Sequence, residues 1–576
     1  MGSDGWVSGL VDAFPKETVA IFNLAKAGRI DEALVIYRWF LPLLELDINA
    51  FLVQNIKLAE VATGLGTEYV RAPRLPLQGA ERERVLAIIA EAYKVYKNCT
   101  GKEKAAFLNA IADEILAIGD PLLDLYCAES GLPRGRAEGE RGRTIFQLRS
   151  FADMLIEGSW LEATLDTAIP DRQPLPKEDL RKMLVPIGPI VVFGSSNFPF
   201  AFSTAGGDTA SALAAGCPVI VKSHSMHIGT GEMVASAVIK AAQKTNMPEG
   251  VFSNLIGSGV VVGGALVSHP LVKGVGFTGS IKGGRALYDL ASQRPEPIPV
   301  FAEMGSINPV VVLPKALENE SQKWATVYAG SITMGTGQFC TNPGLLLGIK
   351  GEDLTRFISE LSTEIEKIAP SCMLHPSIHA DFNQGKELLK SQSGVHTVAE
   401  YKGEIAPNFA SQTLLTVDGK TFLENPTLSH EVFGPFSIIV LCDDEAQLTS
   451  IIDQLAGQLT ATILAEGTEI DNYTAVIAAL QNRVGRIIFN GVPTGVEVCP
   501  SMIHGGPYPA SSDSRFTAVG LDAVKRWVRP FSYQNWPNAL LPIELQDENP
   551  LGILRLVNNK QTYSNIEKCQ EKPSFV

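Results

Sequence analysis

The sequence lacks the features that mark several classes of protein. Its eight cysteines stand in no CxxC pair and in no Cys/His spacing of a metal site, so neither a disulfide framework nor a bound metal is expected. No apolar run approaches the ~20 residues that a membrane span requires, and MGSDGWVSGL has no basic segment followed by an apolar one. We therefore expect a protein of the reducing cytoplasm with no membrane partner.

Runs of basic residues are also missing. The chain has 48 Lys and Arg against 62 Asp and Glu, a net charge of −14, so a nucleic-acid partner is not expected. A content of 45% hydrophobic and 19% charged residues is typical of a globular protein, and 576 residues are too many for one core. Two or three domains are expected, in which a local pocket can still be positive and bind a small anion.

The first ninety residues are predicted to be helical, because apolar residues such as Ile21, Leu24 and Ala25 recur at three- and four-residue spacing. GSDGWVSGLVDAFP and LAKAGRIDEALVIYRWFLPLLEL resemble the C-terminal end of the dihydrodipicolinate synthase/N-acetylneuraminate lyase family. A (β/α)₈ barrel needs eight strands and about 250 residues, and the end of one strand at most is present here. The family's Schiff-base lysine and catalytic tyrosine have no counterpart, so we reject lyase activity and expect a helical appendage over residues 1–95.

From about residue 97 the pattern changes to alternating helices and strands. Thr100 and Glu103 form a capping-box pattern at the start of a helix, and residues 164–184 are expected to form an extended hairpin. Short apolar segments with helical stretches between them predict a parallel, doubly wound sheet. The strands are expected at Ile190–Phe193, Val219–Val221, Val251–Ile256 and Gly274–Phe277, and the helices at Gly206–Ala215 and Gly229–Lys244.

Three segments follow these strands at the edge where such sheets bind ligands. They are Gly194–Phe200 (GSSNFPF), Lys222 with the Ser-His after it, and Phe277–Gly284 (FTGSIKGG). A glycine-rich turn that opens a helix can hold a pyrophosphate by backbone N–H groups. Taken singly, each segment is equally typical of a turn or of a solvated strand end, and only their order together favours a nucleotide site.

A thiol stands in the stretch Thr333–Leu345, which reads TMGTGQFCTNPGL. Its glycines allow backbone N–H groups to approach a reacting centre, and Cys340 in such a turn is a candidate nucleophile. The alternative for Cys340 alone is an inert buried thiol.

These segments, together with FAEMGSINP, GQFCTNPG and EVFGPF, resemble the ordered signature of the aldehyde dehydrogenase superfamily over about residues 95–550. ERGRTIFQLRSFA, AEMGSINP and HGGPYP are similar, more narrowly, to the α-ketoglutarate semialdehyde dehydrogenases, which are related to NADP-dependent fatty-aldehyde dehydrogenases. The resemblance implies an α/β fold. Its expected parts are a Rossmann-like cofactor domain at 96–303 with an oligomerisation flap at 164–184, a catalytic domain at 304–526, and an oligomerisation tail at 527–576. Family members are dimers or tetramers, so a homo-oligomer is expected.

The resemblance also implies the catalytic roles. Cys340 would attack the aldehyde to give a thiohemiacetal, whose oxyanion is stabilised by the Asn197 side-chain amide and the Cys340 backbone N–H. Loss of hydride to the nicotinamide leaves a thioester. Glu303 would then act as the general base for the hydrolytic water.

For the cofactor, the resemblance implies that Lys222 and Glu431 bind ribose, that Gly279 and Ser280 contact the pyrophosphate, and that Phe433 packs by the nicotinamide-side ribose. NAD-preferring relatives often carry a glutamate three residues after the lysine, and this chain has Ser225 there. Without that carboxylate a 2′-phosphate is not repelled, so NADP is expected to be used at least as well as NAD.

His224 and Lys240 are candidates to assist in binding such a phosphate.

The substrate carboxylate of a ketoglutarate semialdehyde requires a fixed cation. Arg143 falls where relatives line the substrate tunnel, although it is equally typical of a basic helix face. Phe198 and Phe202 would form an apolar wall. His504, in MIHGGPYP, lies where related enzymes close the site.

Three functions are therefore carried forward: oxidation of α-ketoglutarate semialdehyde, oxidation of long-chain aliphatic aldehydes, and an inactive chimeric binding or structural protein. A cation in the tunnel favours the first, and a wholly apolar tunnel favours the second. The exchanged N-terminal segment is the argument for the third, and the complete set of Cys340, Glu303 and Asn197 is the argument against it.

Overall fold

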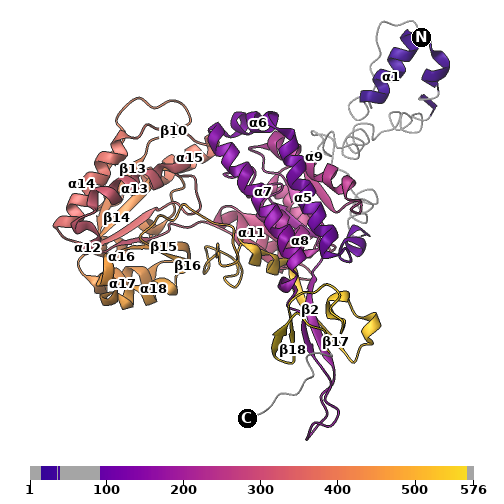
Figure 1. Ribbon diagram of the computed structural model, residues 1–576. Coiled ribbons are helices and arrows are strands. Elements are labelled where there is room, and N and C mark those ends of the chain that lie inside the picture. The colour runs from indigo at the N-terminus through magenta and orange to yellow at the C-terminus, as the bar shows by residue number, and fades with distance from the viewer. Residues whose placement is uncertain (1–14, 35–36, 39–90, 567–576) are drawn as a thin grey trace.

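The computed structural model describes residues 15–34, 37–38 and 91–566. Figure 1 shows two α/β bodies next to each other and a strand-built extension that projects from one of them. The expected appendage at 1–95 lies mostly outside the described residues; within them, α1 (Pro15–Lys26) is a helix. In the described part of the chain, no helix is long and apolar enough to cross a membrane.

The first sheet is entirely parallel, with strand order β5-β4-β3-β6-β7. Its order reverses between β3 and β6, the point at which doubly wound sheets bind ligands. The four strands expected from the sequence are confirmed, each within two residues at its ends. The bounds are β3 (Ile190–Phe193), β4 (Val219–Lys222), β5 (Phe252–Leu255), β6 (Gly274–Thr278) and β7 (Val300–Glu303).

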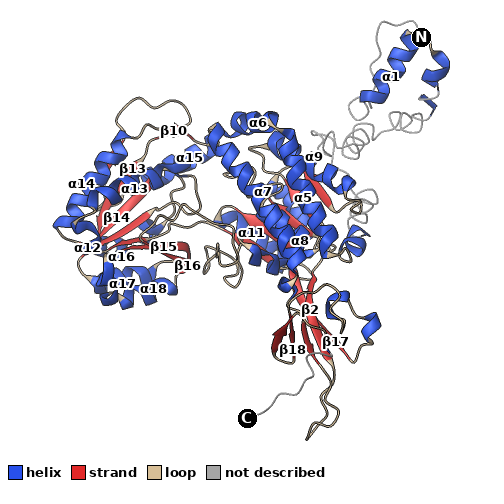
Figure 2. Ribbon diagram, in the orientation of Figure 1, coloured by secondary structure: helices blue, strands red, loops and turns tan. Residues whose placement is uncertain are grey.

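Helices cover both faces of this sheet (Figure 2). Successive residues of β3 enter different cores, Ile190 and Val192 on one face, Val191 and Phe193 on the other. A strand buried on both faces has to be apolar throughout, which explains the unbroken IVVF. The helices are α5 (Gly101–Ile118), α6 (Asp120–Ser130), α7 (Arg134–Glu157), α8 (Gly207–Ala215), α9 (Ile228–Lys244), α10 (Gly264–Ser268) and α11 (Ile281–Ser292).

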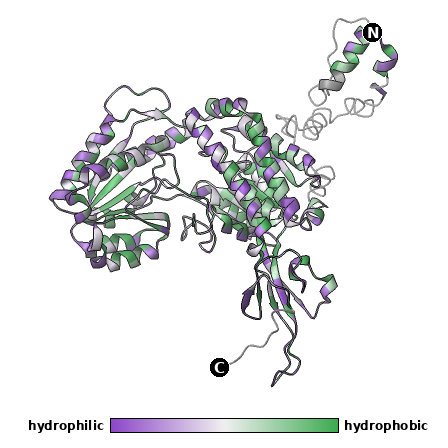
Figure 3. Cartoon of the chain, in the orientation of Figure 1, coloured by the Kyte–Doolittle hydropathy of each residue, from purple (hydrophilic) through white to green (hydrophobic). Residues whose placement is uncertain are grey.

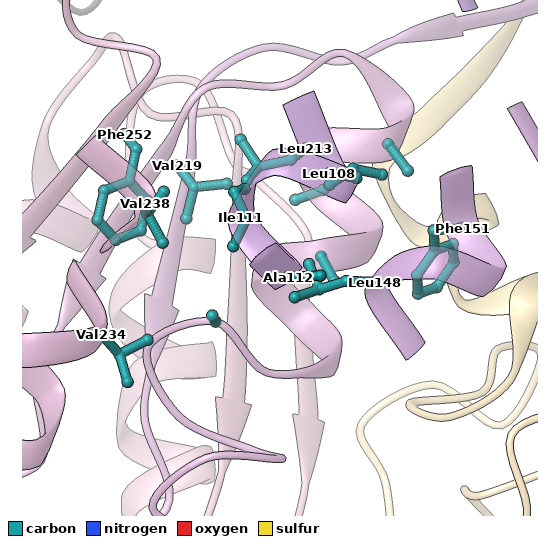
Figure 4. Close-up of a cluster of buried hydrophobic side chains, with 14 of the residues drawn as sticks. Leu108, Ile111, Ala112, Leu148, Phe151, Leu213, Val219, Val234, Val238 and Phe252 are labelled. Atoms are coloured by element: carbon teal, nitrogen blue, oxygen red, sulfur yellow. The ribbon is translucent and has the colours of Figure 1, made fainter. Parts of the chain in front are cut away.

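The larger core of this body lies where α5, α7, α8 and α9 meet β4 and β5 (Figure 4). Leu108 and Leu213 are completely buried there, as are Val219 and Val238. Burying a side chain of this size stabilises the folded state by about 1.5–3 kcal/mol relative to leaving it exposed to water. Packing of this kind fixes α7 and α8 against the sheet and so positions the loops at its carboxyl edge.

The second sheet has seven strands in the order β11-β13-β14-β9-β8-β15-β16, of which only β11 runs antiparallel to its neighbour. In β9, Leu345 and Leu347 enter one core and Leu346 the other. Figure 3 shows these strands as hydrophobic inside helices whose outer faces are hydrophilic. The strands are β8 (Val310–Val312), β9 (Leu345–Ile349), β11 (His396–Glu400), β13 (Thr413–Asp418), β14 (Phe436–Cys442), β15 (Gln458–Leu464) and β16 (Val484–Phe489).

The helices of the second body lie on both faces of that sheet. Ile332 of α13 and Phe357 of α14 pack in one core, and Ile451 of α17 and Leu480 of α18 in the other. The helices are α12 (Pro314–Glu318), α13 (Ser321–Thr333), α14 (Glu352–Lys367), α15 (Pro376–Lys390), α16 (Gly419–Glu424), α17 (Glu445–Gln454) and α18 (Thr474–Gln481).

The extension is a five-stranded sheet of order β17-β2-β1-β18-β19. The antiparallel pairing of β1 with β2 confirms the expected hairpin. The domain limits and the role of this sheet in assembly stay predictions. The strands are β1 (Thr164–Asp166), β2 (Leu180–Pro186), β17 (Val528–Gln534), β18 (Arg555–Val557) and β19 (Lys560–Thr562); β10 (Ser371–Cys372) and β12 (Phe409–Ala410) form a separate pair.

The capping box at the start of α5 provides a local test of the fold. Thr100 Oγ1 accepts from the Glu103 N–H at 3.2 Å, and the Glu103 carboxylate accepts from the Thr100 N–H at 2.7 Å. Thr100→Ala is expected to destabilise the first turn by about 1 kcal/mol. Hydrogen exchange of the first-turn amides should become about fivefold faster, whereas Thr100→Ser should leave it unchanged. Equal exchange in the Ala and Ser variants would contradict the cap.

Candidate active site

Three side chains from distant parts of the chain converge between the two sheets. Glu303 ends β7, Cys340 lies between α13 and β9, and His504 lies in a loop after β16. His504 Nε2 is 3.4 Å from Cys340 Sγ and 3.0 Å from Glu303 Oε2. Glu303 and His504 are almost completely buried, and Cys340 is partly buried. The thiol, the imidazole and the carboxylate therefore form one cluster in which each group contacts the other two.

The backbone around Cys340 requires glycine at Gly337. This residue has φ +63°, and a Cβ there would lie 2.2 Å from the backbone of Gly434. Asn308 holds the segment from the other side, since its Nδ2 donates to the carbonyl oxygens of Cys340 and Asn342, each at 2.9 Å. The glycine and the amide together determine where the thiol stands.

The surroundings of Cys340 disfavour its thiolate. Burial, the negative charge of Glu303 and, less strongly, that of Glu431 raise the pKa of the thiol well above its usual value. The thiol is therefore protonated at neutral pH. A base in contact would be needed to remove its proton, and both His504 Nε2, 3.4 Å from Sγ, and the Glu303 carboxylate contact the thiol.

Asn197 lies against the segment that carries Cys340. Its Nδ2 donates to the carbonyl oxygen of Gln338 at 3.0 Å. The loop after β3 is anchored by Glu140 of α7, whose buried carboxylate accepts from the N–H groups of Phe200 at 2.8 Å and Ala201 at 3.0 Å. A buried carboxylate with these donors holds the amide close to the thiol.

The expected cofactor residues of the first body lie along the carboxyl edge of its sheet. Lys222 ends β4, where burial lowers its pKa, and its Nζ has no hydrogen bond or ion pair within the described residues. Ser225 is exposed just beyond it. Gly279 and Ser280 open α11, where Ser280 Oγ accepts from the Gly283 N–H at 3.2 Å. An unpaired ammonium group and an exposed helix N-terminus fit an anionic nucleotide.

The two candidates for binding the 2′-phosphate are placed differently. Burial and the neighbouring His227 lower the pKa of His224 to about 3, so its ring is neutral and supplies no cation. Lys240 lies about 18 Å along α9 from its N-terminus, and its Nζ is 3.9 Å from Glu114. Lys240 therefore lies twelve residues along α9 from the end that follows β4, and its part in binding a phosphate stays a prediction.

Glu431 and Phe433 come from the second body. Both line a pocket that also includes Ser306, Gly337 and Phe339, next to the Cys340 segment. Gly305 allows the close approach, because a Cβ there would lie 2.3 Å from Glu431 Oε2. Although Glu431 keeps an exposed surface, the protein atoms around its carboxyl group desolvate it and raise its pKa to about 7. Glu431 and Lys222 form no ion pair with each other. Because they belong to different bodies, a ribose bound by both would be held from two sides.

The expected substrate residues form one continuous group. Arg143 lies with its guanidinium carbon 5.7 Å from the ring centre of Phe202, and the Phe202 ring is 5.1 Å from Phe198 and 6.2 Å from His504. Arg143 donates through Nη1 to the Val496 carbonyl oxygen, whereas its buried Nη2 has no partner within the described residues. Burial lowers the pKa of Arg143, against the raising effect of Glu497, Glu140 and, least, the Cys340 thiol. Phe202 and His504 thus connect a partly buried cation to the candidate nucleophile Cys340.

Sequence reasoning missed Asn308 and Arg136. Arg136 lies over the rings of Phe198 and Phe339, 4.5 and 4.7 Å from their centres, and donates to the Asn197 carbonyl oxygen at 3.1 Å. Its spacing of one helical turn from Glu140 on α7 was the available signal. Nothing in the local sequence around Asn308 indicates its contact with Cys340.

Comparison with known proteins gives two family matches. The model of the aldehyde dehydrogenase family matches residues 76–508, and that of the dihydrodipicolinate synthetase family matches residues 1–92. "Alpha-ketoglutaric semialdehyde dehydrogenase 2" of Azospirillum brasilense is 49% identical over 481 residues, covering 84% of this chain and 92% of that protein. "Alpha-ketoglutaric semialdehyde dehydrogenase" of Acinetobacter baylyi is 46% identical over 476 residues, covering 82% and 90%.

Solved structures have the same fold at low identity. Glyceraldehyde-3-phosphate dehydrogenase GapN of Methanocaldococcus jannaschii, complexed with NADP, has a TM-score of 0.67 at 19% identity, over 81% of this chain and 96% of that one. 1-Pyrroline-5-carboxylate dehydrogenase from Thermus, with bound NAD, has a TM-score of 0.64 at 20% identity, over 79% and 85%. These matches confirm the expected α/β architecture of the chain after its N-terminal segment.

The electrostatics of Cys340 can be tested by alkylation. In the wild type, the rate of reaction with iodoacetamide should still be rising above about pH 8.5, the pKa of a free cysteine. Glu303→Gln should move this profile to lower pH, because it removes a negative charge that raises the thiol pKa. The reaction is followed at the Cys340 peptide by mass spectrometry.

Glu431→Gln should give a smaller shift in the same direction, and Glu318→Gln, on the exposed surface of α12, should give none. A profile that stays in place or moves to higher pH in Glu303→Gln would show that the carboxylate does not act on the thiol.

Proposed function

Because the chain belongs to the aldehyde dehydrogenase family, we propose that it oxidises α-ketoglutarate semialdehyde to α-ketoglutarate with NADP, or NAD, as the hydride acceptor. Two relatives that bear this activity in their names align over more than four fifths of the chain. The structural observation that supports the proposal most is the guanidinium nitrogen of Arg143 that is unpartnered among the described residues; Arg143 lies over Phe202, the ring that also packs 6.2 Å from His504. The reading as an inactive chimera is not favoured, since the proposed catalytic residues are all present and close together.

Cys340 is the proposed nucleophile. Its proton passes from Sγ to His504 Nε2, 3.4 Å away, and the imidazolium that forms lies 3.0 Å from the Glu303 carboxylate. A buried carboxylate at this distance stabilises the protonated ring. Sγ then forms a bond to the carbonyl carbon, which gives a thiohemiacetal.

The oxyanion of this intermediate is assigned to the Asn197 amide and the Cys340 backbone N–H. The Asn197 amide already lies on the Cys340 segment through its 3.0 Å bond to the Gln338 carbonyl oxygen. A nicotinamide held by the residues assigned below would supply the hydride acceptor for the conversion of the thiohemiacetal to a thioester. Glu303 then removes a proton from the water that attacks the thioester carbonyl carbon. The C–S bond breaks, the Cys340 sulfur takes back the proton held by His504, and the acid is released.

The cofactor is assigned to the two residue groups at the sheet edges. Lys222 and Glu431 would hold a ribose, Gly279 and Ser280 the pyrophosphate, and Phe433 the nicotinamide end. The exposed Ser225 carries no negative charge that would repel a 2′-phosphate, which supports use of NADP. His224 would contribute shape or a hydrogen bond, because its ring is neutral.

The substrate carboxylate is assigned to Arg143, with Phe198 and Phe202 as the apolar wall between it and the thiol. A guanidinium held in place by one backbone carbonyl retains further N–H donors for a carboxylate. Burying a cation costs free energy unless a partner compensates it, and an aliphatic aldehyde offers no carboxylate to pair with the guanidinium. The position of Arg143 therefore supports the acidic semialdehyde over a long-chain aldehyde.

Assembly into a dimer or tetramer stays a prediction. It is supported by the projecting sheet, whose outer strands β17 and β19 each have one edge that pairs with no strand among the described residues. Phe531, Trp536 and Leu540 are exposed on or next to β17. An apolar strand edge of this kind is suited to pairing with another chain.

The substrate proposal is tested by reduction of NADP with α-ketoglutarate semialdehyde, an uncharged aldehyde of similar length, and a long-chain aldehyde. The wild type should prefer the semialdehyde, and Cys340→Ala should be inactive with all three. Arg143→Leu should lower kcat/KM for the semialdehyde about 10- to 150-fold, the loss of about 1.5–3 kcal/mol for hydrogen bonds to a charged group. Its activity with the uncharged aldehyde should be nearly unchanged.

Arg149→Leu provides a matched control on the same helix, because Arg149 is exposed and pairs with Asp113. Equal losses with the charged and uncharged aldehydes in Arg143→Leu would overturn the clamp. A wild-type preference for the long-chain aldehyde would overturn the substrate itself.

The cofactor proposal is tested by Ser225→Glu. A carboxylate there should repel the 2′-phosphate and lower kcat/KM for NADP about fivefold or more, since like charges about 4 Å apart in water repel by about 1 kcal/mol. The value for NAD should stay the same or improve, and Ser225→Gln should have little effect with either cofactor. An equal response to NADP and NAD would show that position 225 does not face the phosphate.

A further inference from the structure

We propose that Cys340, His504 and Glu303 also form a reversible Zn²⁺ site, whose occupation blocks the thiol and inhibits the enzyme. The ligands would be Cys340 Sγ, His504 Nε2 and one carboxylate oxygen of Glu303. The inference requires only the geometry of these three side chains and does not depend on which aldehyde the enzyme oxidises.

The ligand atoms have the spacing of a shared metal ion. All three lie within 4.8 Å of one another, with Sγ to Nε2 at 3.4 Å and Nε2 to Oε2 at 3.0 Å. Around a tetrahedral zinc ion, with bonds of about 2.0–2.3 Å, such ligand atoms stand about 3.4–3.6 Å apart. A small movement of the side chains is therefore enough to bring them onto one ion.

The carboxylate of Glu303 favours a cation at this place. Glu303 is 4% exposed, and no backbone, hydroxyl or amide donor within the described residues hydrogen-bonds its oxygens. Its polar neighbours are the Cys340 thiol and the His504 ring. A buried carboxylate with so few donors is costly, and a metal ion satisfies it directly.

The imidazole is already oriented for the same ion. His504 is 1% exposed, its backbone N–H donates to Thr517 Oγ1 at 2.9 Å, and its backbone carbonyl oxygen accepts from the Ala518 N–H at 2.8 Å. The backbone of the loop is thus fixed, and Nε2 points at both other ligands. Fixed ligands lose little conformational entropy when a metal binds.

The donor set selects the class of metal. Sulfur, imidazole nitrogen and one carboxylate oxygen suit Zn²⁺ and exclude Mg²⁺ and Ca²⁺, which prefer oxygen alone. Three protein ligands leave the fourth tetrahedral position for water. On binding, Sγ loses its proton to solvent and forms a bond to the ion. Because the aldehyde carbon needs the same sulfur atom, zinc and substrate exclude each other.

The test uses Co²⁺, a spectroscopic substitute for Zn²⁺, on the full chain freed of metals and thiol reductants. We expect thiolate-to-cobalt charge-transfer absorption that saturates at about one ion per chain and is abolished by added Zn²⁺. The absorption should be absent in Cys340→Ala and much weaker in His504→Asn. Cys127→Ala, which removes a partly buried thiol on α6, should bind like the wild type.

A second measurement follows stability and activity. Zn²⁺ should raise the Tm of the wild type and of Cys127→Ala but not that of Cys340→Ala, because only a folded site binds it. Zinc should also inhibit turnover competitively with aldehyde, and a chelator should restore it. Charge transfer that survives in Cys340→Ala, or its absence from the wild type, would overturn the site.

The zinc site and the proposed reaction can fail separately. Cobalt binding needs no turnover, so a protein that oxidises the semialdehyde but shows no charge transfer lacks only the metal site. A protein that binds cobalt through Cys340 but oxidises no aldehyde retains the metal site and loses the proposed function.

Discussion

A protonated thiol next to a buried carboxylate is the constraint on which the rest of this structure depends. Burial and the charge of Glu303 both disfavour the thiolate of Cys340, so the proposed nucleophile is protonated until a base removes its proton. His504 resolves this by standing in contact with both groups. The same arrangement that allows a proton to move between sulfur and carboxylate also gathers three metal ligands, so reactivity and sensitivity to zinc have one physical origin.

Holding three such groups together requires both α/β bodies. Glu303 comes from the end of β7 in the first sheet, whereas Cys340 lies just before β9 and His504 after β16 of the second sheet. Asn308 and Gly337 hold the Cys340 segment, and Glu140 holds the loop of Asn197. The contacts of Glu303 with Cys340 and His504, and of Asn197 with Gln338, cross from one body to the other, so the site exists only when both bodies are folded and packed against each other.

The N-terminal segment has a separate origin in sequence. Its match to the dihydrodipicolinate synthetase family ends at residue 92, inside the range of the aldehyde dehydrogenase match that begins at residue 76. The capping box of Thr100 and Glu103 begins the first long helix of the first α/β body just after this overlap. Every residue proposed for catalysis lies beyond that helix, so the proposed site draws on no residue of the segment that matches the dihydrodipicolinate synthetase family.

Local patterns in the sequence determined the strands around β3, the cap of α5 and the motifs that carry Cys340, Glu303 and Asn197, because burial on both faces, capping and tight turns depend on residues close in the chain. The same local reasoning found no metal spacing, since ligands 37 and 164 residues apart leave no short-range pattern. Only the tertiary structure decided three features of the site. These are the contacts of His504 with Cys340 and Glu303, the hydrogen bond from Asn308 to the Cys340 carbonyl oxygen, and the unpartnered nitrogen of Arg143. They depend on how the two sheets and α7 pack in space.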